Sequence, residues 1–171
     1  MAVAKYLKQI WKKPDKNLLH DKMIKWRKGN AVERVEKPLR LDKARKLGYK
    51  AKPGDIVVRA RVKRGGHKKP RPNKGRRTKR LTPRKTLSMN YREIAERRAA
   101  RKYKNCEVLN SYWIGKDGKF YFYEVILVDT SKKEIKKDKQ LGFLSNKANK
   151  KRVFRGLTSA ASKSRGLRNS P

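Results

Sequence analysis

The segment 63–85 limits most strongly how this chain can fold. Of its 23 residues, 12 are Lys or Arg and none is Asp or Glu; three glycines and three prolines interrupt it, and Leu81 is its single aliphatic residue. It buries too little apolar surface to offset the entropy that ordering costs, so alone in water we expect it to be disordered. Phosphate backbone would neutralise it, because each bound Lys or Arg releases counterions. A solvated basic loop is the plainer alternative, but the run lies between two segments that read as folded.

The remaining charge indicates how the chain is organised. The 171 residues include 52 Lys and Arg against 14 Asp and Glu, a formal net charge of +38. This excess opposes compaction by self-repulsion, which again indicates a polyanionic partner. Residues 86–144 are the least charged part of the chain. We expect one domain over 1–171, with a core from about 1–62 and 86–144, a basic arm over 63–85 and a basic C-terminal extension over 145–171.

Several classes of site find no support in the composition. Cys106 is the one cysteine, so an intramolecular disulfide is impossible and a reducing compartment is expected. That cysteine and two distant histidines, His20 and His67, have no usual zinc-ligand spacing. Lysines interrupt the first apolar positions, and no apolar run approaches the roughly 18 residues of a membrane helix. We expect no metal, no cofactor, no small-molecule substrate, no signal peptide and no membrane span.

The N-terminal region has the periodicity of two helices. Over 2–13, apolar residues recur at helical spacing with lysines opposite, at Val3, Tyr6, Leu7, Ile10 and Trp11. We expect this face to dock on the protein's own core or on RNA; a membrane surface is the less favoured alternative. A second helix is expected over 16–28, beginning after Asp15 and ending at Gly29.

Shorter elements lead from these helices to the basic arm. Val32 and Val35 indicate a short strand, and Asp42 is expected to cap a helix over 43–47. Tyr49, flanked by lysines, either stacks on a base or packs on the core, and both interpretations remain open. The alternation in 56–63 predicts a half-buried antiparallel strand whose outer face is basic and includes Val57, Arg59, Arg61 and Lys63.

The second half of the chain predicts a helix followed by a hairpin. The helix is expected to run from an N-cap at Ser88 to about Lys104, with Glu93 and Arg97 paired across one turn. Glu93 and Glu96 resemble a catalytic carboxylate pair, but with many arginines nearby we expect surface ion pairs instead.

The hairpin joins strands at 107–115 and 120–129 through Asp117-Gly118. On its first strand, alternation places Val108, Asn110, Tyr112 and Ile114 on one face and Leu109, Ser111 and Trp113 on the other. The aliphatic run 125–128 is expected to be covered on both faces, and 131–139 to hold a short polar helix. In 145–171, small residues alternate with Arg and Lys, which suits close approach to phosphate or bases; a flexible surface tail is the alternative.

Several segments resemble one family, the large-subunit ribosomal protein fifteen of archaea and eukaryotes, which is unrelated to the bacterial protein of the same number. The matching segments follow the family's order, cover nearly the whole chain, and lie at 40–52, 62–66, 108–113, 124–129, 153–160 and 165–167. Leu-Asn-Ser-Tyr-Trp at 109–113 and Arg-Gly-Leu-Thr at 155–158 are the most specific. Family members usually continue into a further basic, glycine-rich tail, so contacts made by that tail are in doubt for a chain that stops at Pro171.

The resemblance implies an α+β fold, with a small antiparallel sheet, packed helices, an extended basic RNA-binding loop and a basic C-terminal tail. It further implies a structural, non-catalytic constituent of cytoplasmic ribosomes, with large-subunit ribosomal RNA and neighbouring ribosomal proteins as partners. The residues expected to contact RNA are Arg45, Tyr49, Lys50, Lys52, Arg59, Arg61, Lys63, Arg64, His67, Lys68, Lys69, Arg71, Lys74, Arg76, Arg77, Lys79, Arg80, Arg84, Arg152, Arg155, Lys163, Arg165 and Arg168.

Two alternative functions share part of this pattern. A DNA- or RNA-compacting, chromatin-like protein would have the same charge and arms, but would bind duplex DNA and folded RNA alike. An RNA-modifying enzyme would need convergent functional groups, and the sequence offers neither a Gly-rich nucleotide motif nor a nucleophile with a base. We therefore expect no enzymatic activity.

Overall fold

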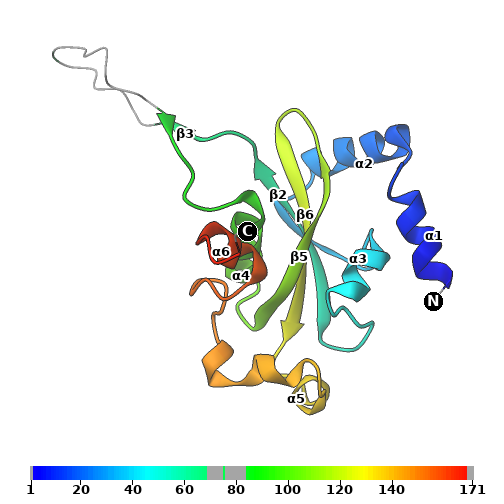
Figure 1. The fold of residues 1–171 in the computed structure, drawn as a ribbon, viewed down its shortest axis with the longest axis vertical. Coiled ribbons are helices and arrows are strands. Elements are labelled where there is room, and N and C mark those ends of the chain that lie inside the picture. The colour runs from blue at the N-terminus through cyan, green and yellow to red at the C-terminus, as the bar shows by residue number, and fades with distance from the viewer. Residues whose placement is uncertain (1, 69–74, 76–83, 169–171) are drawn as a thin grey trace.

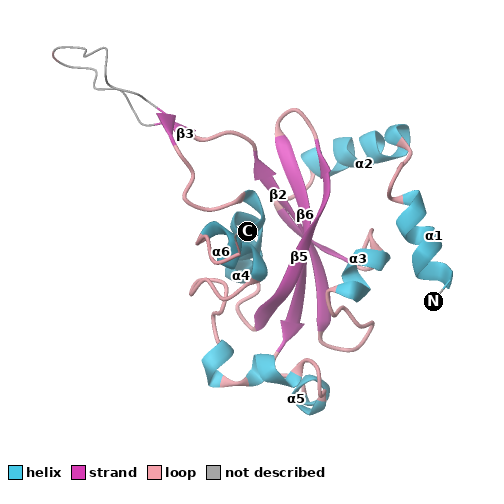
Figure 2. Cartoon of the chain, viewed as in Figure 1, coloured by secondary structure: helices cyan, strands magenta, loops and turns pink. Residues whose placement is uncertain are grey.

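The computed structural model describes residues 2–68, 75 and 84–168, and its centre is an open four-stranded sheet (Figures 1 and 2). All neighbouring strands are antiparallel, and their order is β1 (Val32–Val35), β2 (Asp55–Lys63), β6 (Phe120–Asp129) and β5 (Cys106–Lys116). The mixed α+β class and the hairpin are confirmed. In the hairpin turn, Asp117 Oδ1 accepts hydrogen bonds from the N–H groups of Lys119 and Phe120, at 2.7 and 2.5 Å.

One face of the sheet packs under helix α4 (Tyr91–Lys102). Its buried side chains include Val58, Val62, Val125 and Leu127 from the sheet, with Ala95 and Ala99 from the helix. The short helix α6 (Ser159–Ser164) lies on the same side (Figure 1). Alanines on α4 let its backbone come close to the sheet, so the narrow apolar stripe of this helix is sufficient to cover it.

The opposite face packs under helices α2 (Lys16–Lys28) and α3 (Leu41–Lys46). Trp26 of α2 meets Phe122 of β6 edge to face, with ring centroids 5.3 Å apart. The predicted half-buried character of β2 is therefore wrong: Val57 on the supposed outer face is 2% exposed. Arg59 and Arg61 on that face lie against the aromatic rings of Trp26 and Phe120, at 5.0 and 4.8 Å from the ring centroids.

Strand β5 contains two β-bulges, between Val108 and Asn110 and between Trp113 and Gly115. A bulge inserts one extra residue and exchanges the faces of the residues that follow. Val108 therefore packs under α4, whereas Tyr112 and Ile114 pack under α2 and α3. The predicted single face shared by Val108, Tyr112 and Ile114 is wrong. The run 125–128, by contrast, is buried throughout and contributes to both faces, as predicted.

The helix starts are confirmed in part. Asp15 Oδ1 accepts from the N–H of Asn17 at 2.8 Å, which confirms the expected cap of α2. The N-cap of α4 is Asn90 rather than Ser88, and its Oδ1 accepts from the N–H of Glu93 at 2.8 Å. Helix α3 begins at Leu41 without a side-chain cap, because Asp42 lies within the first turn and receives the Arg40 guanidinium at 3.3 Å.

Helix α1 (Ala2–Ile10) is shorter than the predicted helix and packs on the protein less than expected. Val3, Tyr6 and Ile10 are 66, 63 and 61% exposed, so they do not dock on the protein's own core. Trp11, just after the helix, is half-buried beneath the guanidinium of Arg40, 4.9 Å from the ring centroid.

The chain after β6 closes one end of the sheet and then returns along α4. Ile135 of α5 (Lys133–Lys137) packs with Val128 of β6 and Leu144 of the 3₁₀ turn η1 (Gly142–Ser145). A second 3₁₀ turn, η2 (Lys147–Asn149), follows. Beyond it, the C-terminal block buries Val153, Thr158, Ala160 and Ala161, so this basic segment carries core residues as well as charge.

The basic arm leaves the body as two paired strands. β3 (His67–Lys68) pairs antiparallel with β4 (Arg84–Lys85), with His67 opposite Lys85 and Lys68 opposite Arg84. Figure 1 shows β3 well away from the sheet and helices. Of the predicted RNA contacts, Lys69, Arg71, Lys74, Arg76, Arg77, Lys79 and Arg80 lie outside the described residues.

Candidate nucleic-acid interface

The base of the arm is fixed to the hairpin turn and to the first residue of α4. The N–H of Arg64 donates to Lys119 O at 2.9 Å, and its guanidinium donates to Asp117 O at 2.6 Å. One residue on, the N–H of Gly65 donates to the hydroxyl of Tyr91 at 3.0 Å. The ring of Tyr91 packs in turn against that of Tyr121 at a tilt of 34°, with centroids 4.8 Å apart. These contacts set the direction in which the chain leaves β2.

Two of the predicted RNA-contacting arginines already have protein partners. Arg59 pairs with Glu33 at 2.5 Å, and its side chain is 17% exposed. The guanidinium of Arg61 donates to the backbone oxygens of Arg27 and Trp26. Arg59 therefore joins β2 to β1, and Arg61 joins β2 to α2. Lys63, the next basic residue on the same face, is exposed.

The cluster at 45–52 divides in the same way. Arg45 is exposed on α3, whereas Tyr49 packs beside the core cluster beneath α2 and α3. The ammonium groups of Lys50 and Lys52 both lie 3.1 Å from Asp138 Oδ2. A hydrogen bond from the N–H of Gln140 and these two lysines lower the pKa of Asp138 below its usual range. The two lysines thereby join the segment that leads into β2 to the segment that follows α5.

The basic side chains of the C-terminal block fall into two groups, one packed on the protein and the other exposed to solvent. Arg152 is half-buried and donates to the backbone oxygens of Val108 and Leu109 at 2.8 and 3.1 Å, and burial lowers its pKa. It therefore fastens the C-terminal block to β5. Arg155, Lys163, Arg165 and Arg168 are exposed, although Arg155 also donates to Ala148 O and Arg168 to Ser159 Oγ.

A row of arginines on α4 is absent from the predicted set. Arg97, Arg98 and Arg101 line a groove between α4 and the segment 86–89, and the groove continues towards Arg155 and Arg165. The sequence does carry a signal for it: Arg97 and Arg101 are four residues apart, so they lie on one helix face. That signal is weak alone, because charged helix faces are usually simply solvated.

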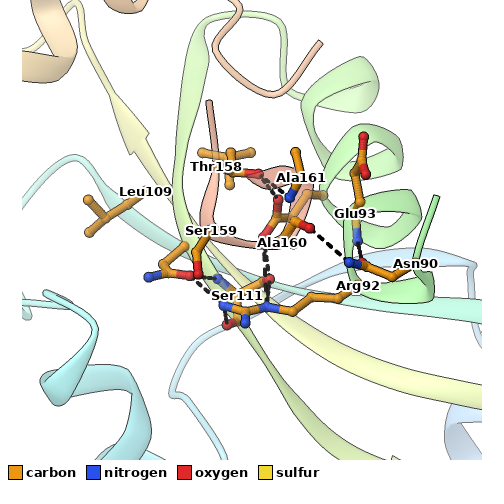
Figure 3. A network of polar contacts seen from close by, with 12 residues as sticks. Asn90, Arg92, Glu93, Leu109, Ser111, Thr158, Ser159, Ala160 and Ala161 are labelled. Atoms are coloured by element: carbon orange, nitrogen blue, oxygen red, sulfur yellow. Dashed lines mark hydrogen bonds and ion pairs between the residues drawn. The ribbon is translucent and has the colours of Figure 1, made fainter. Parts of the chain in front are cut away.

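The carboxylates expected on the surface of α4 are buried. Glu93 is 3% and Glu96 0% exposed, so the prediction of surface ion pairs is wrong, although the pairing of Glu93 with Arg97 at 2.9 Å is confirmed. Glu96 accepts hydrogen bonds from the hydroxyls of Ser111 and Thr158, two residues that Figure 3 labels. Burial raises the pKa of Glu96. This carboxylate therefore ties α4, β5 and the C-terminal block together.

Figure 3 also shows Arg92 beside this cluster, directed at β5. Its guanidinium donates to Ser111 Oγ at 2.7 Å and to Asn110 Oδ1 at 2.5 Å, and lies 3.9 Å from Glu96 Oε1. Burial lowers the pKa of Arg92. The oxygens of Glu96 accept hydrogen bonds from two hydroxyls and lie near a guanidinium. The cluster therefore holds neighbouring segments together and does not form an open carboxylate pair.

Metal sites and membrane spans can be assessed over residues 2–68 and 84–168. No group of three or more potential metal-ligating side chains occurs in this part of the chain. No helix of the described residues is long and apolar enough to cross a membrane. What distinguishes this surface is its arginine and lysine content, together with the anchored exit of the basic arm.

A comparison with protein families adds a direct result. The family model for L15e, described as Ribosomal L15, matches residues 2–171, essentially the whole chain. This is the archaeal and eukaryotic type, distinct from the bacterial protein of the same number. The chain therefore belongs to the L15e family of large-subunit ribosomal proteins, which are structural constituents of the ribosome.

Proposed function

We propose that this chain binds the RNA of the large ribosomal subunit and stabilises one tertiary arrangement of it. Lysines and arginines of the arm and of the C-terminal block neutralise phosphates where RNA helices pack together. Neighbouring ribosomal proteins are its other partners, and the assembled particle works in the cytoplasm. The role is structural and involves no catalytic step.

The observation that carries this proposal is the anchored exit of the arm. Phosphate contacts bring affinity but little sequence information, so placement on RNA must come from the shape of both partners. Arg64 and Gly65 are tied to the hairpin turn and to Tyr91, which gives the arm a defined starting direction. A positively charged segment with a fixed origin is suited to entering one particular gap between RNA helices.

The proposed contacts fall into two groups. Exposed side chains of the described body form the first, namely Arg45, Lys63, Arg155, Lys163, Arg165 and Arg168. The arm forms the second: His67, Lys68, Lys69, Arg71, Lys74, Arg76, Arg77, Lys79, Arg80 and Arg84. The remaining predicted residues have protein partners or pack beside the core, so we assign them mainly to holding the body in shape.

Competition binding tests the proposal. The full chain would be bound to labelled, folded large-subunit RNA and challenged with equal nucleotide concentrations of unlabelled folded RNA or duplex DNA. We expect folded RNA to displace the label far more effectively, because it alone offers the shape that the anchored arm fits. Equal displacement by the two competitors would instead indicate a general polyanion-compacting protein.

A further inference from the structure

The groove along α4 consists of two adjoining cavities that share a wall. The first, of about 350 Å³, is lined by Leu87, Ile94, Arg98 and Arg101 among others. The second, of about 280 Å³, is lined by Phe154, Arg155, Gly156 and Arg165 among others. Ser88, Met89 and Arg97 line both cavities. The groove is therefore built from two regions that are distant in sequence, 86–101 and 154–165.

The charge of the groove favours an anion. Five arginines line it, at 97, 98, 101, 155 and 165, and the one carboxylate in its lining is Glu93. That carboxylate is buried and accepts from Arg97 Nε at 3.0 Å, so it is already neutralised. An anionic ligand would therefore meet an excess of guanidinium groups, which form strong charge-assisted hydrogen bonds to phosphate.

Two of these arginines are held in place before any ligand arrives. Arg97 is fixed by Glu93 and lies 5.9 Å from the centroid of the Phe154 ring. Arg98 donates to the backbone oxygen of Arg61 at 2.9 Å. Fixed side chains lose less conformational entropy on binding, so they contribute more to affinity than mobile surface arginines.

The cavities also have apolar lining, and their volumes limit the size of the ligand. Leu87, Met89 and Ile94 line the first cavity, and Phe154 in the second is 37% exposed. Ligand pockets of a few hundred cubic ångströms hold small molecules or single residues, not a double helix. Unpaired RNA, however, splays its bases out to stack on aromatic and guanidinium planes.

We propose that this groove binds an unpaired, single-stranded segment of RNA. A base inserts against Leu87, Met89 and Ile94, and the adjacent phosphates lie between Arg97, Arg155 and Arg165. The inference rests on the proposed function for the presence of RNA, and goes beyond it by assigning one conformation of RNA to one site. The arm then serves packed RNA helices, and the groove serves a strand end, loop or bulge.

Two variants of the full chain separate occupancy from charge. Ser88→Trp fills the rim shared by both cavities without removing a charge; its matched control is Gln9→Trp, on exposed α1 and outside the groove. Arg98→Gln combined with Arg101→Gln removes two charges from the groove at arginines outside the contacts proposed for packed RNA helices. Its control is Lys133→Gln combined with Lys136→Gln on α5. Thermal unfolding establishes that each variant is folded. If Ser88→Trp does not fold, the double arginine variant still tests the groove.

The probes are a short fluorescent oligouridylate and a short RNA duplex, measured at moderate salt. Losing one stacked base costs about 1–3 kcal/mol, so we expect the groove variants to lower oligouridylate affinity by about 5- to 150-fold. Duplex affinity should stay close to that of the matched controls. A 4-thiouridine version of the oligomer should cross-link under ultraviolet light to residues of the groove, Met89 and Phe154 foremost.

The outcomes distinguish this inference from the proposed function. Equal loss of oligouridylate and duplex binding, or cross-links found only outside the groove, would overturn the groove assignment while leaving ribosomal RNA binding intact. Displacement of the oligomer by polyglutamate as readily as by RNA would assign the groove to an acidic protein segment instead. Failure of the unmodified chain to prefer folded ribosomal RNA would contradict the proposed function itself.

Discussion

At the scale of single residues, buried carboxylates hold together segments that are far apart in sequence. Glu96 joins Ser111 and Thr158, which lie 15 and 62 positions away. On the other face, Glu124 accepts from the hydroxyl of Tyr112 at 2.5 Å and from the N–H of Leu39 at 3.1 Å. Removing one partner from such a network leaves a buried polar group unsatisfied, which costs roughly 1–3 kcal/mol.

The raised pKa of Glu96 leads to a testable prediction about pH. Because burial raises this pKa above the ordinary value of 4.5, the folded protein holds the proton more tightly than the unfolded chain does. The stabilisation is complete below the pKa of the unfolded chain and is lost as pH rises through the pKa of the folded protein. Each pH unit that separates these two pKa values contributes about 1.4 kcal/mol to the free energy of unfolding. Denaturant unfolding from about pH 4 to pH 8 would compare the natural chain with Glu96→Gln, which stays neutral.

The expected result is a difference between the two proteins that depends on pH. The unfolding free energy of the natural chain, relative to the Gln variant, should fall as pH rises. Other titrating groups, including the buried Glu124, are common to both proteins and cancel in this comparison. A difference that stays constant over the whole range would show that Glu96 does not titrate differently on folding.

At the scale of elements, the junction of β2, α4 and the hairpin turn orients the arm. The Tyr91 hydroxyl both accepts from the N–H of Gly65 and donates to its oxygen, at 3.0 and 3.3 Å. This hydroxyl is the contact by which α4 holds the first glycine of the arm. Its removal tests the junction without changing the charge of the protein.

Tyr91→Phe should weaken RNA binding more than it weakens the fold. A lost hydrogen bond costs about 0.5–1.5 kcal/mol, and a loosened exit lowers the fraction of chains with the arm correctly directed. We expect up to about a tenfold loss of affinity for folded large-subunit RNA, with faster amide hydrogen exchange at Gly65 and Gly66. Tyr103→Phe, also a partly buried tyrosine near α4, is the matched control. Unchanged affinity together with faster exchange would mean that the junction does not orient the arm for binding.

The same scale shows what the sequence can and cannot predict. The hairpin follows from Asp117-Gly118 between β-branched and aromatic runs, and both strands form where expected. The bulges do not follow from local pattern, because a one-residue offset depends on which face each side chain packs against. The N-cap residue of α4 also depends on a contact that is distant in sequence. Asn90 Nδ2 donates to Ala160 O at 2.8 Å, which favours Asn90 over Ser88 as the N-cap.

The candidate site likewise contains features that the sequence predicts and features that it does not. Alternation in β2 predicts that the strand runs directly into the basic arm, and the chain does so. The sequence does not reveal that Arg59, Arg61 and Arg152 are enclosed by protein, since their partners come from other segments. The arginine groove is hidden for the same reason, because α4 and the 154–165 region meet only in the folded chain.

At the scale of the whole molecule, a net charge of +38 makes binding to RNA strongly dependent on salt. Arg76, Arg77 and Arg80 are predicted phosphate contacts in the arm. Replacing all three by Ala should weaken binding to many RNA sequences alike and reduce the slope of log affinity against log salt by about 2–3. Titrations of folded large-subunit RNA at several salt concentrations measure this slope.

A control with equal charge makes that measurement specific. Replacing Lys133, Lys136 and Lys137 of α5 by Ala removes the same number of charges from an exposed helix outside the arm. This variant should keep most of the natural slope, because α5 carries none of the proposed RNA contacts. An arm variant whose slope equals that of the natural chain would contradict phosphate contact by these arginines.

Sedimentation of a native lysate through sucrose tests the central claim most directly. The protein would be followed across gradients at low and high salt, with RNase-treated and DNase-treated controls. An integrated, RNA-bound component should migrate with the large subunit at moderately high salt and leave that position after RNase treatment. Release at modest salt, or migration that is sensitive to DNase instead, would contradict the account and leave a general binder of polyanions.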